Sequence, residues 1–266
     1  MSYSVCGVST RRPQPTLLRR AAARLGVAAV LGLLATAAAG RPAHAQFGTN
    51  LITNAGAEAG AGGTGTGGAP ISGWTTSGDF AVIRYGVSDY PGAASPGPAD
   101  RGLNFFGGGY GASSSATQLL DLSGYAGLGG LIDAGRVRFS LGAYLGGFSS
   151  QNDNMALIAE FLDGGSAFVG SNTLGPALSD VRGGVTGLLQ YGDADFVPVG
   201  TRFVRFTMAS TRTAGSSNDG YADNLSFVLS RVSDPSVVPE PGTWALLGTG
   251  LVALAGVARR RGRARA

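Results

Sequence analysis

The stretch Arg136-Val-Arg-Phe-Ser-Leu-Gly-Ala-Tyr-Leu145 alternates polar and apolar residues along its whole length. In an extended chain successive side chains point to opposite sides, so the apolar members of this stretch would share one face. A strand with one apolar and one polar face is typical of an antiparallel sheet that is buried on one side. The alternation predicts a half-buried strand whose inward residues are Val137, Phe139, Leu141, Ala143 and Leu145.

Further short runs repeat this signal between turns rich in Gly, Asn, Asp and Pro. Gly accounts for 46 of 266 residues, and each interior Gly destabilises a helix by about 1 kcal/mol relative to Ala. We therefore predict an all-β fold, an antiparallel β-sandwich of the jelly-roll type, over residues 46–232. We expect a short helical turn within 125–133 and a mobile loop over 60–68. The other predicted strands are 80–85, 103–106, 116–122, 155–162, 167–169, 185–191, 202–208 and 224–230.

The formal net charge of +4 is unevenly distributed along the chain. Residues 1–45 hold six Arg and no acidic residue, and residues 239–266 hold five Arg and one Glu. Residues 46–238 hold nine Arg and fifteen acidic residues. Nucleic-acid binding depends on basic side chains that neutralise phosphates. Because the central segment is acidic, we expect no nucleic-acid partner.

The residue types that are missing restrict the chemistry of the central segment. The chain has no Lys, its only Cys is Cys6 and its only His is His44. A mature protein that begins at Gln46 would contain none of these three residue types. This excludes Cys–His and Ser–His catalytic pairs, Schiff-base lysines and zinc sites built from His or Cys. Its chemistry would have to come from carboxylates, hydroxyls, Arg and bound cations.

The amino-terminal residues 1–45 have the pattern of a signal peptide. Five Arg precede an apolar run over 25–39, which is followed by Ala43-His44-Ala45, an A-x-A cleavage signature. The alternative is an amino-terminal membrane anchor, but the run is shorter than the roughly 20 residues that span a bilayer. We expect cleavage before Gln46 and export through the inner membrane.

The carboxyl-terminal residues 239–266 combine three features in a fixed order, after a linker over 233–238. Pro239-Glu240-Pro241 comes first, an apolar run over about 243–258 follows, and the basic tail 259–266 begins with Arg259, Arg260 and Arg261. The run is long enough for a short transmembrane helix, and the positive-inside rule would keep its Arg cluster in the cytoplasm as a membrane stop. We therefore expect an inner-membrane anchor with the central domain outside the cell membrane.

This three-part tail resembles the PEP-CTERM sorting signal of Gram-negative bacteria. The resemblance implies that an exosortase, a membrane-embedded processing enzyme, recognises Pro239, Glu240 and Pro241. It also implies an association with exopolysaccharide and biofilm, and a final location at the cell surface or outside the cell. The Pro on each side of Glu240 would keep this segment extended and accessible. The alternative is an ordinary tail anchor with a Pro-rich junction.

The central domain resembles secreted galactose-binding-like and carbohydrate-binding-module jelly rolls. Asn50-Leu-Ile-Thr-Asn-Ala-Gly-Ala-Glu58 followed by Gly73-Trp74 is similar to their opening motif, with Ala57 where Phe is usual. Asn218-Asp-Gly-Tyr-Ala-Asp-Asn-Leu-Ser-Phe227 is similar to their closing strand. The resemblance implies a structural Ca²⁺ ion held by Glu58 and Asp223, with carbonyl oxygens completing its ligands. The alternative is that Glu58 caps a turn and Asp223 accepts hydrogen bonds from backbone amides.

Sugar binding requires aromatic surfaces beside groups that hydrogen-bond hydroxyls. We expect Tyr144, on the polar face of its strand, and Trp74 to be the ligand-binding residues; packing in the core or at an edge is the alternative. Four more aromatic residues lie in or beside predicted loops: Tyr85, Tyr90, Tyr110 and Phe148. The acidic groups Asn152-Asp153-Asn154 and Asp193-Ala194-Asp195 are interpreted as solvated turns.

The acidic residues are scattered, which does not favour an enzyme. A glycosidase needs two carboxylates facing each other, and no local motif pairs an acid with a base. Glu160 lies in an apolar strand, where we expect it to point to solvent on the far face of the sheet. We therefore predict a non-enzymatic surface or matrix protein that is associated with exopolysaccharide or biofilm through the jelly-roll domain. The alternative is a secreted carbohydrate-active hydrolase that uses carboxylates.

Overall fold

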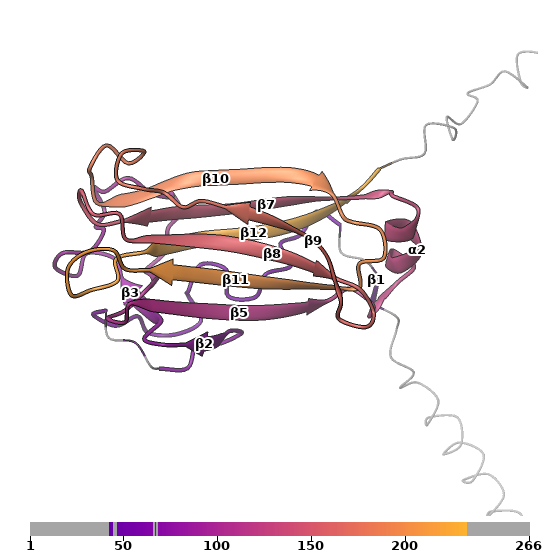
Figure 1. Ribbon diagram of the computed structural model, residues 1–266, viewed down its shortest axis with the longest axis horizontal. Coiled ribbons are helices and arrows are strands. Elements are labelled where there is room, and N and C mark those ends of the chain that lie inside the picture. Colours follow the sequence, from indigo (N-terminus) through magenta and orange to yellow (C-terminus); the bar gives the residue numbers. More distant parts are fainter. Residues whose placement is uncertain (1–42, 45–46, 66, 68, 233–266) are drawn as a thin grey trace, which may run out of the picture. The chain divides into compact units, whose positions relative to one another are not determined.

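The computed structural model describes residues 43–44, 47–65, 67 and 69–232. These residues form an antiparallel β-sandwich of two five-stranded sheets with almost no helix (Figure 1). The nine predicted strands are confirmed. The first sheet has the order β10-β7-β12-β4-β3, from Gly187–Phe196, Val137–Gly147, Tyr221–Arg231, Asn104–Gly107 and Ala81–Arg84. The second has the order β2-β5-β11-β8-β9, from Thr75–Ser77, Ser113–Asp121, Phe203–Thr211, Asn154–Leu162 and Phe168–Leu174.

The eight strands β4, β5 and β7 to β12 run back and forth between the two sheets. In chain order their positions read 6-3-8-1 in the first sheet and 2-7-4-5 in the second, which is the double Greek key of a jelly roll. β3 extends the first sheet beside β4, and β2 extends the second beside β5. The short helix α2 (Leu128–Asp133) lies within the predicted helical turn, after the two-residue strand β6 (Tyr125–Ala126).

The main core lies between the sheets and is built from alternate residues of each strand. β7 buries the five apolar residues that its alternation predicts. At the centre, Phe139 of β7 and Phe227 of β12 stack at a centroid distance of 5.7 Å, and Phe206 of β11 meets Phe227 edge to face at 5.1 Å. Burying a Phe side chain contributes about 1.5–3 kcal/mol, so the facing sheets are held together without disulfides.

A second, smaller core covers the outer face of the first sheet and was not predicted. We call it the outer aromatic cluster. Phe105 and Tyr221 are fully buried here, 5.2 Å apart between ring centroids, and Tyr85, Tyr90, Tyr144 and Phe148 pack around them. The segment 85–103 covers this cluster, and it is pinned to β10 by a 2.9 Å hydrogen bond from Leu188 N to Pro96 O. β4 is buried on both faces for this reason.

Within the Gly-rich stretch 60–68, which was predicted to be a mobile loop, Gly63 pairs with the first sheet. Gly63 N donates to Val82 O at 2.9 Å and Arg84 N donates to Gly63 O at 3.1 Å, so Gly63 forms a bridge beside β3. The side chain of Asn104 lies against Gly62, where a Cβ atom would overlap it. The absence of a side chain at Gly62 therefore lets this stretch approach the sheet, which a composition argument does not detect.

The described chain enters and leaves the sandwich at the same end. Ala43–His44 form β1, which pairs in parallel with β6 beside α2, and Val232 N donates to Arg136 O at 3.0 Å (Figure 1). The opposite end carries the β7–β8 and β11–β12 loops. Apart from its last residues, the predicted signal peptide 1–45 lies outside the described residues, as do the linker and the predicted transmembrane helix 243–258. In the described part of the chain, no helix is long and apolar enough to cross a membrane.

Candidate functional site

A cavity of about 380 Å³ opens at the loop end of the sandwich, opposite α2. We call it the loop-end cavity. Five segments surround it: the stretch before β2, the loop after β3, the loop after β4, the loop between β7 and β8, and the loop between β11 and β12. Its lining combines aromatic rings, carboxylates, hydroxyls and one amide, from Thr64, Ser88, Asp89, Tyr90, Tyr110, Phe148, Gln151, Gly215, Ser216, Ser217 and Asp219.

Three aromatic side chains supply the apolar part of this lining. Tyr110 is 46% exposed, and Phe148 and Tyr90 are half-buried. The ring of Tyr90 packs against Tyr221 at a centroid distance of 5.9 Å, so it is anchored to the outer aromatic cluster. Burial raises the pKa of the Tyr90 hydroxyl to about 12, and the charges of Asp219 and Asp89 add to this shift. Tyr90 is therefore a neutral hydrogen-bond donor and acceptor beside two carboxylates.

Asp219 is the more buried of the two carboxylates, with 9% of the residue exposed. Its Oδ1 accepts a 2.9 Å hydrogen bond from the Tyr221 hydroxyl. Burial raises the pKa of Asp219 above its ordinary value, and the nearby charges of Asp153 and Asp89 act in the same direction. Asp89 lies on the loop after β3 with a φ of 69°, in the turn that Tyr90 N closes on Val87 O.

Asp153 fixes the β11–β12 loop and is not a solvated turn residue, so that interpretation of Asn152-Asp153-Asn154 was wrong. Asp153 is fully buried. Its Oδ1 accepts hydrogen bonds from Thr213 N at 2.6 Å, Thr213 Oγ1 at 2.9 Å and Ala214 N at 2.9 Å, and its Oδ2 accepts one from Asp219 N at 3.1 Å. One carboxylate thus holds both ends of the loop that presents Asp219.

Two Arg side chains fix the other walls of the loop-end cavity. Arg182 is 5% exposed, and its guanidinium donates to the carbonyls of Gly147, Ser149 and Gln151 at 2.7–3.1 Å. The guanidinium of Arg212 donates to Tyr110 O at 2.8 Å and Ser216 O at 2.7 Å. Because these guanidinium groups are engaged with carbonyl oxygens, they position the loops and do not line the cavity. The cavity is therefore preorganised by the buried Asp153 and Arg182 and by the half-buried Arg212.

The two residues of the predicted calcium site meet at a second location, on the outer face of the first sheet. Asp223 is fully buried; its Oδ2 accepts from the Tyr85 hydroxyl at 2.7 Å and its Oδ1 from Asn224 N at 2.7 Å. Glu58 Oε1 accepts from Leu103 N at 2.9 Å and Asn104 N at 2.8 Å. Glu58 therefore bonds amides 45 and 46 residues away and caps no local turn.

Burial raises the pKa of Asp223 to about 7, and the charges of Glu58 and Asp100 contribute to the shift. Asn224 Oδ1 also faces this place, since a Cβ atom at Gly56 would lie 3.3 Å from it and 3.7 Å from Asp223 Oδ1. The oxygens of Asp223, Glu58 and Asn224 are hard donors of the kind that Ca²⁺ prefers. Among the described residues no group of three acidic side chains has the spacing of a metal site, so carbonyl or amide oxygens would have to complete the ligands.

The predicted sugar-binding residues Trp74 and Tyr144 lie away from the loop-end cavity. Trp74 is 7% exposed; its ring meets Phe106 edge to face at 5.9 Å and its Nε1 donates to Asn54 O at 3.4 Å. Tyr144 is half-buried in the outer aromatic cluster, paired across the strands with Asp223. Trp74 also lines an open hollow of about 550 Å³ beside Gln118 and Arg205. Sugar binding by Trp74 or Tyr144 stays a prediction. The aromatic residues at the loop-end cavity are three of the other loop residues: Tyr90, Tyr110 and Phe148.

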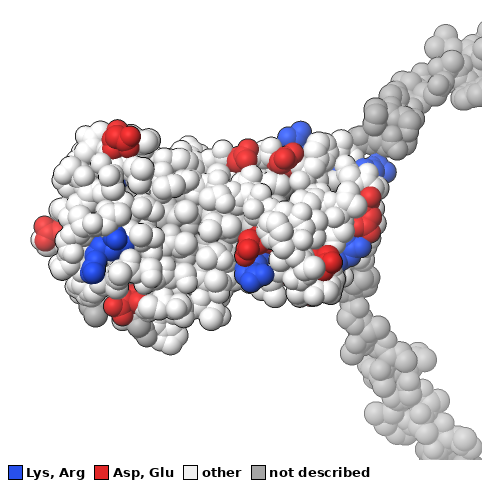
Figure 2. Space-filling model, viewed as in Figure 1, with Lys and Arg blue, Asp and Glu red and all other residues white. Residues whose placement is uncertain are grey.

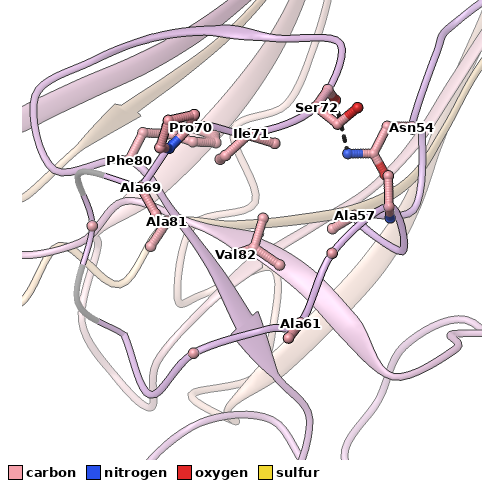
Figure 3. Close-up of a pocket in the computed structure, with 14 residues that line it drawn as sticks. Asn54, Ala57, Ala61, Ala69, Pro70, Ile71, Ser72, Phe80, Ala81 and Val82 are labelled. Atoms are coloured by element: carbon pink, nitrogen blue, oxygen red, sulfur yellow. Dashed lines mark hydrogen bonds between the residues drawn. The ribbon is translucent and has the colours of Figure 1, made fainter.

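A second cavity, of about 230 Å³, lies between the 57–63 segment and β3 (Figure 3). Most of its lining is Ala, Gly, Ile and Val, and its one side-chain hydrogen bond drawn in Figure 3 joins Asn54 Nδ2 to Ser72 O at 3.0 Å. Without charged groups or exposed aromatic rings among its lining residues, it has little that could orient a polar ligand. The loop-end cavity is the stronger candidate.

The outer face of the second sheet carries few charges and mixes polar with apolar side chains such as Leu119 and Ile158. Glu160 lies on this face, as predicted, and pairs with Arg205 of β11 at 3.3 Å. Figure 2 shows that acidic and basic groups are scattered over the visible face of the described residues, without a large patch of either sign. Asp193 and Asp195 are exposed as predicted, but they belong to β10 and not to a turn.

Residues 237–261 match the PEP-CTERM protein-sorting motif. No curated protein matches the chain. Among solved structures, the tailspike protein 4 of bacteriophage CBA120 is 18% identical with a TM-score of 0.41; the match covers 68% of this chain and only 21% of the tailspike. A cyclase from Fischerella sp. TAU is 15% identical (TM-score 0.46, 69% and 98% of the two chains). A family 16 carbohydrate-binding module is 20% identical with a TM-score of 0.31; the match covers 48% of this chain and 77% of the module.

The matched segment includes Pro239, Glu240 and Pro241 and the three Arg that begin the basic tail. It lies outside the residues that the structure describes, so its assignment rests on sequence alone. A sorting signal of this kind implies an exported protein that an exosortase processes. The chain carries a PEP-CTERM protein-sorting motif at residues 237–261 and an antiparallel β-sandwich before it.

Proposed function

We propose that this chain is an exported, non-enzymatic protein of the cell surface or extracellular matrix, whose β-sandwich binds polysaccharide at the loop-end cavity. The observation that carries the proposal is the lining of that cavity. Aromatic rings of Tyr110 and Phe148 lie beside carboxylates, hydroxyls and an amide, and these are the groups that stack on sugar rings and hydrogen-bond their hydroxyls. The sorting motif supports the other part of the proposal, the location at the cell surface or in the matrix, because such a motif would direct the domain to where polysaccharide occurs.

The positions of the cavity and of the tail agree with this role. β12 runs from Tyr221, beside the cavity, to Arg231, beside α2. Eleven residues at about 3.3 Å each place the two ends of this strand roughly 33 Å apart. The segment that leads to the sorting motif leaves from the α2 end. A domain held by its tail would therefore present the loop-end cavity away from the point of attachment.

We also propose a structural Ca²⁺ ion at Glu58 and Asp223, with Asn224 as a further oxygen donor. The support is a fully buried carboxylate beside a second acidic side chain, without a basic side chain hydrogen-bonded to either among the described residues. A bound cation would offset the cost of keeping these charges out of water. It would also link the opening segment at Glu58 to the closing strand β12.

The alternative function is a carboxylate-dependent glycoside hydrolase, because Asp89 and Asp219 line the same cavity and Asp219 has a raised pKa. We favour binding over catalysis because Asp219 already accepts a hydrogen bond from Tyr221. The secreted protein should leave a panel of chromogenic glycosides and esters intact. Hydrolysis that Asp219→Asn abolishes would establish the enzyme instead.

The binding proposal is tested by retention of the mature protein on exopolysaccharide from its own cells. Tyr110→Ala should weaken retention at least fivefold, because it removes the most exposed ring of the cavity. Phe168→Ala is the matched control: Phe168 is 63% exposed on β9, at the opposite end of the sandwich. Equal retention of wild type, Tyr110→Ala and Phe168→Ala would contradict a sugar site at the loop-end cavity.

A further inference from the structure

The loop-end cavity has an uncompensated negative charge. Its lining includes two carboxylates, Asp89 and Asp219, and no basic side chain. The two ion pairs of the described residues, Arg202–Asp133 and Arg205–Glu160, lie elsewhere. The guanidinium groups of Arg182 and Arg212 donate to backbone carbonyls around the cavity. Neither carboxylate therefore has a cation as a direct partner within the described part of the chain.

The hydrogen bonding of Asp219 is a second observation that favours a ligand, independent of the net charge of the cavity. It is nine-tenths buried, and only its Oδ1 has a hydrogen bond with a described residue, the 2.9 Å bond from Tyr221. The Oδ2 atom of Asp219 is not among the buried unpartnered atoms of the described residues, so it is open to the cavity that Asp219 lines. Asp153 holds Asp219 in this position by accepting a hydrogen bond from its backbone amide. The rigid loop thus holds a carboxylate oxygen ready for a donor that comes from outside the protein.

The side chains that line the cavity indicate which chemical group this donor would be. Aromatic faces attract cations, most strongly at sites shielded from water, and Tyr90, Tyr110 and Phe148 provide three such rings. A hydroxyl of a neutral sugar would gain a hydrogen bond but nothing from the negative charge. A uronic acid would be repelled by Asp89 and Asp219. A primary ammonium group combines a strong donor with a charge that both carboxylates and rings attract.

We propose that the loop-end cavity is selective for amino sugars with a free ammonium group, such as the glucosamine units of a partly deacetylated polysaccharide. This inference rests on the sugar-binding function proposed above and adds its substrate class. The ammonium group would donate to Asp219 and lie near Asp89, while the sugar ring packs against Tyr110 or Phe148. Ser216, Ser217 and Gln151 would hydrogen-bond the remaining hydroxyls.

The test compares two probes with the mature full-length protein at pH 6: a hexamer of glucosamine and the same hexamer fully N-acetylated. We expect the free amine to bind at least tenfold more tightly, and its affinity to fall as ionic strength rises. Asp219→Asn, which keeps an acceptor for Tyr221, should reduce the difference between the probes to less than threefold. Asp195→Asn changes an exposed carboxylate of β10 and should leave it unchanged.

The possible failures are distinguishable. Equal affinity for the two hexamers, or a salt-independent preference that survives both Asp219→Asn and Asp89→Asn, would overturn the amino-sugar inference and leave sugar binding intact. Binding of neither hexamer, together with no retention on exopolysaccharide, would overturn the proposed function itself. Hydrolysis of either hexamer would support the alternative enzyme.

Discussion

Asp223 is a fully buried carboxylate, and its protonation should couple to the stability of the domain. Its pKa in the folded protein is about 7, against about 3.9 for an unfolded chain. The folded state therefore binds more protons between these values, and the free energy of unfolding should fall as pH rises from about 4 to about 7. In EDTA we expect the protein to be less stable at pH 8 than at pH 5, by at most about 3 kcal/mol. Urea unfolding at the two pH values measures this difference.

Calcium should reverse the loss at pH 8, because the cation favours the charged forms of Asp223 and Glu58. We expect millimolar Ca²⁺ to raise the thermal midpoint by several degrees, and EDTA to lower it again. Asp223→Asn should abolish the response to Ca²⁺ and flatten the pH dependence in EDTA, whereas Asp195→Asn should change neither. If the wild-type protein had the same thermal midpoint in Ca²⁺ and in EDTA, the proposed metal site would be contradicted.

Asp153 should be among the most sensitive residues of the domain, because its carboxylate accepts four hydrogen bonds in a buried place. Asp153→Ala leaves buried amide donors without partners, so we expect a loss of at least about 3 kcal/mol in the free energy of unfolding. The exposed Asp195→Ala should change it by less than about 0.5 kcal/mol. Denaturant titrations of both variants give the comparison, and similar stabilities would contradict a structural role for Asp153.

Local sequence could not separate these acidic residues from ordinary turn residues. Asp153 lies between two Asn, a composition typical of solvated turns, and its partners Thr213, Ala214 and Asp219 are 60 to 66 residues away. The pairing of Glu58 with Asp223 was expected only because it resembled a known family. The two residues do meet in space, and the bound cation remains a proposal.

At the level of strands, periodicity located the elements well because each strand of a sandwich has one apolar face. It could not locate the outer aromatic cluster, since that core depends on the segment 85–103 folding back over the first sheet. The sequence of β4 contains a local sign that both of its faces are buried. In Asn104-Phe-Phe-Gly107 the two adjacent Phe point to opposite faces, and both are buried. A pair of adjacent aromatic residues in a short strand is thus a signal for two covered faces.

The contact between β7 and β10 depends on a glycine and gives a prediction for these elements. A Cβ atom at Gly146 would overlap the carbonyl oxygen of Gly187 in the facing strand. Because that oxygen belongs to the backbone, it can move only if the pairing of β10 with β7 is disturbed. Gly146→Ala should therefore destabilise the domain by about 3 kcal/mol and weaken the hydrogen-exchange protection of β10 amides.

The matched control is Gly192→Ala, since a Cβ atom there would lie 3.6 Å from Leu141 O, an ordinary contact. Its cost should stay within about 1 kcal/mol, the usual scale of a surface strand substitution. If both variants unfolded at the same urea concentration as the wild type, close packing of β7 against β10 would not limit the choice of residue at 146.

At the scale of the whole molecule, the sorting motif and the candidate binding cavity belong to separate segments of the chain. The acidic, Lys-free sandwich has its preorganised cavity at the loop end, and the described chain enters and leaves at the α2 end. The excess positive charge belongs to the terminal segments. The total of +4 consequently describes neither the exported domain nor its cavity. Sequence was sufficient for this division because charge and hydropathy change abruptly at the segment boundaries, whereas the cavity is formed by five segments from distant parts of the chain.

The sorting motif predicts a specific change in the mass of the mature protein. In wild-type cells we expect a chain that begins at Gln46 and is cut before the apolar run 243–258, because we expect an exosortase to recognise the Pro239-Glu240-Pro241 segment. In cells that lack the exosortase, the intact mass should correspond to residues 46–266. Replacing Pro239, Glu240 and Pro241 by Ala should give this longer chain in wild-type cells as well, whereas Pro235→Ala in the linker should be processed normally. A mass spanning 46–266 in both strains would indicate a plain membrane anchor, and the protein would then stay at the inner membrane with its cavity facing outward.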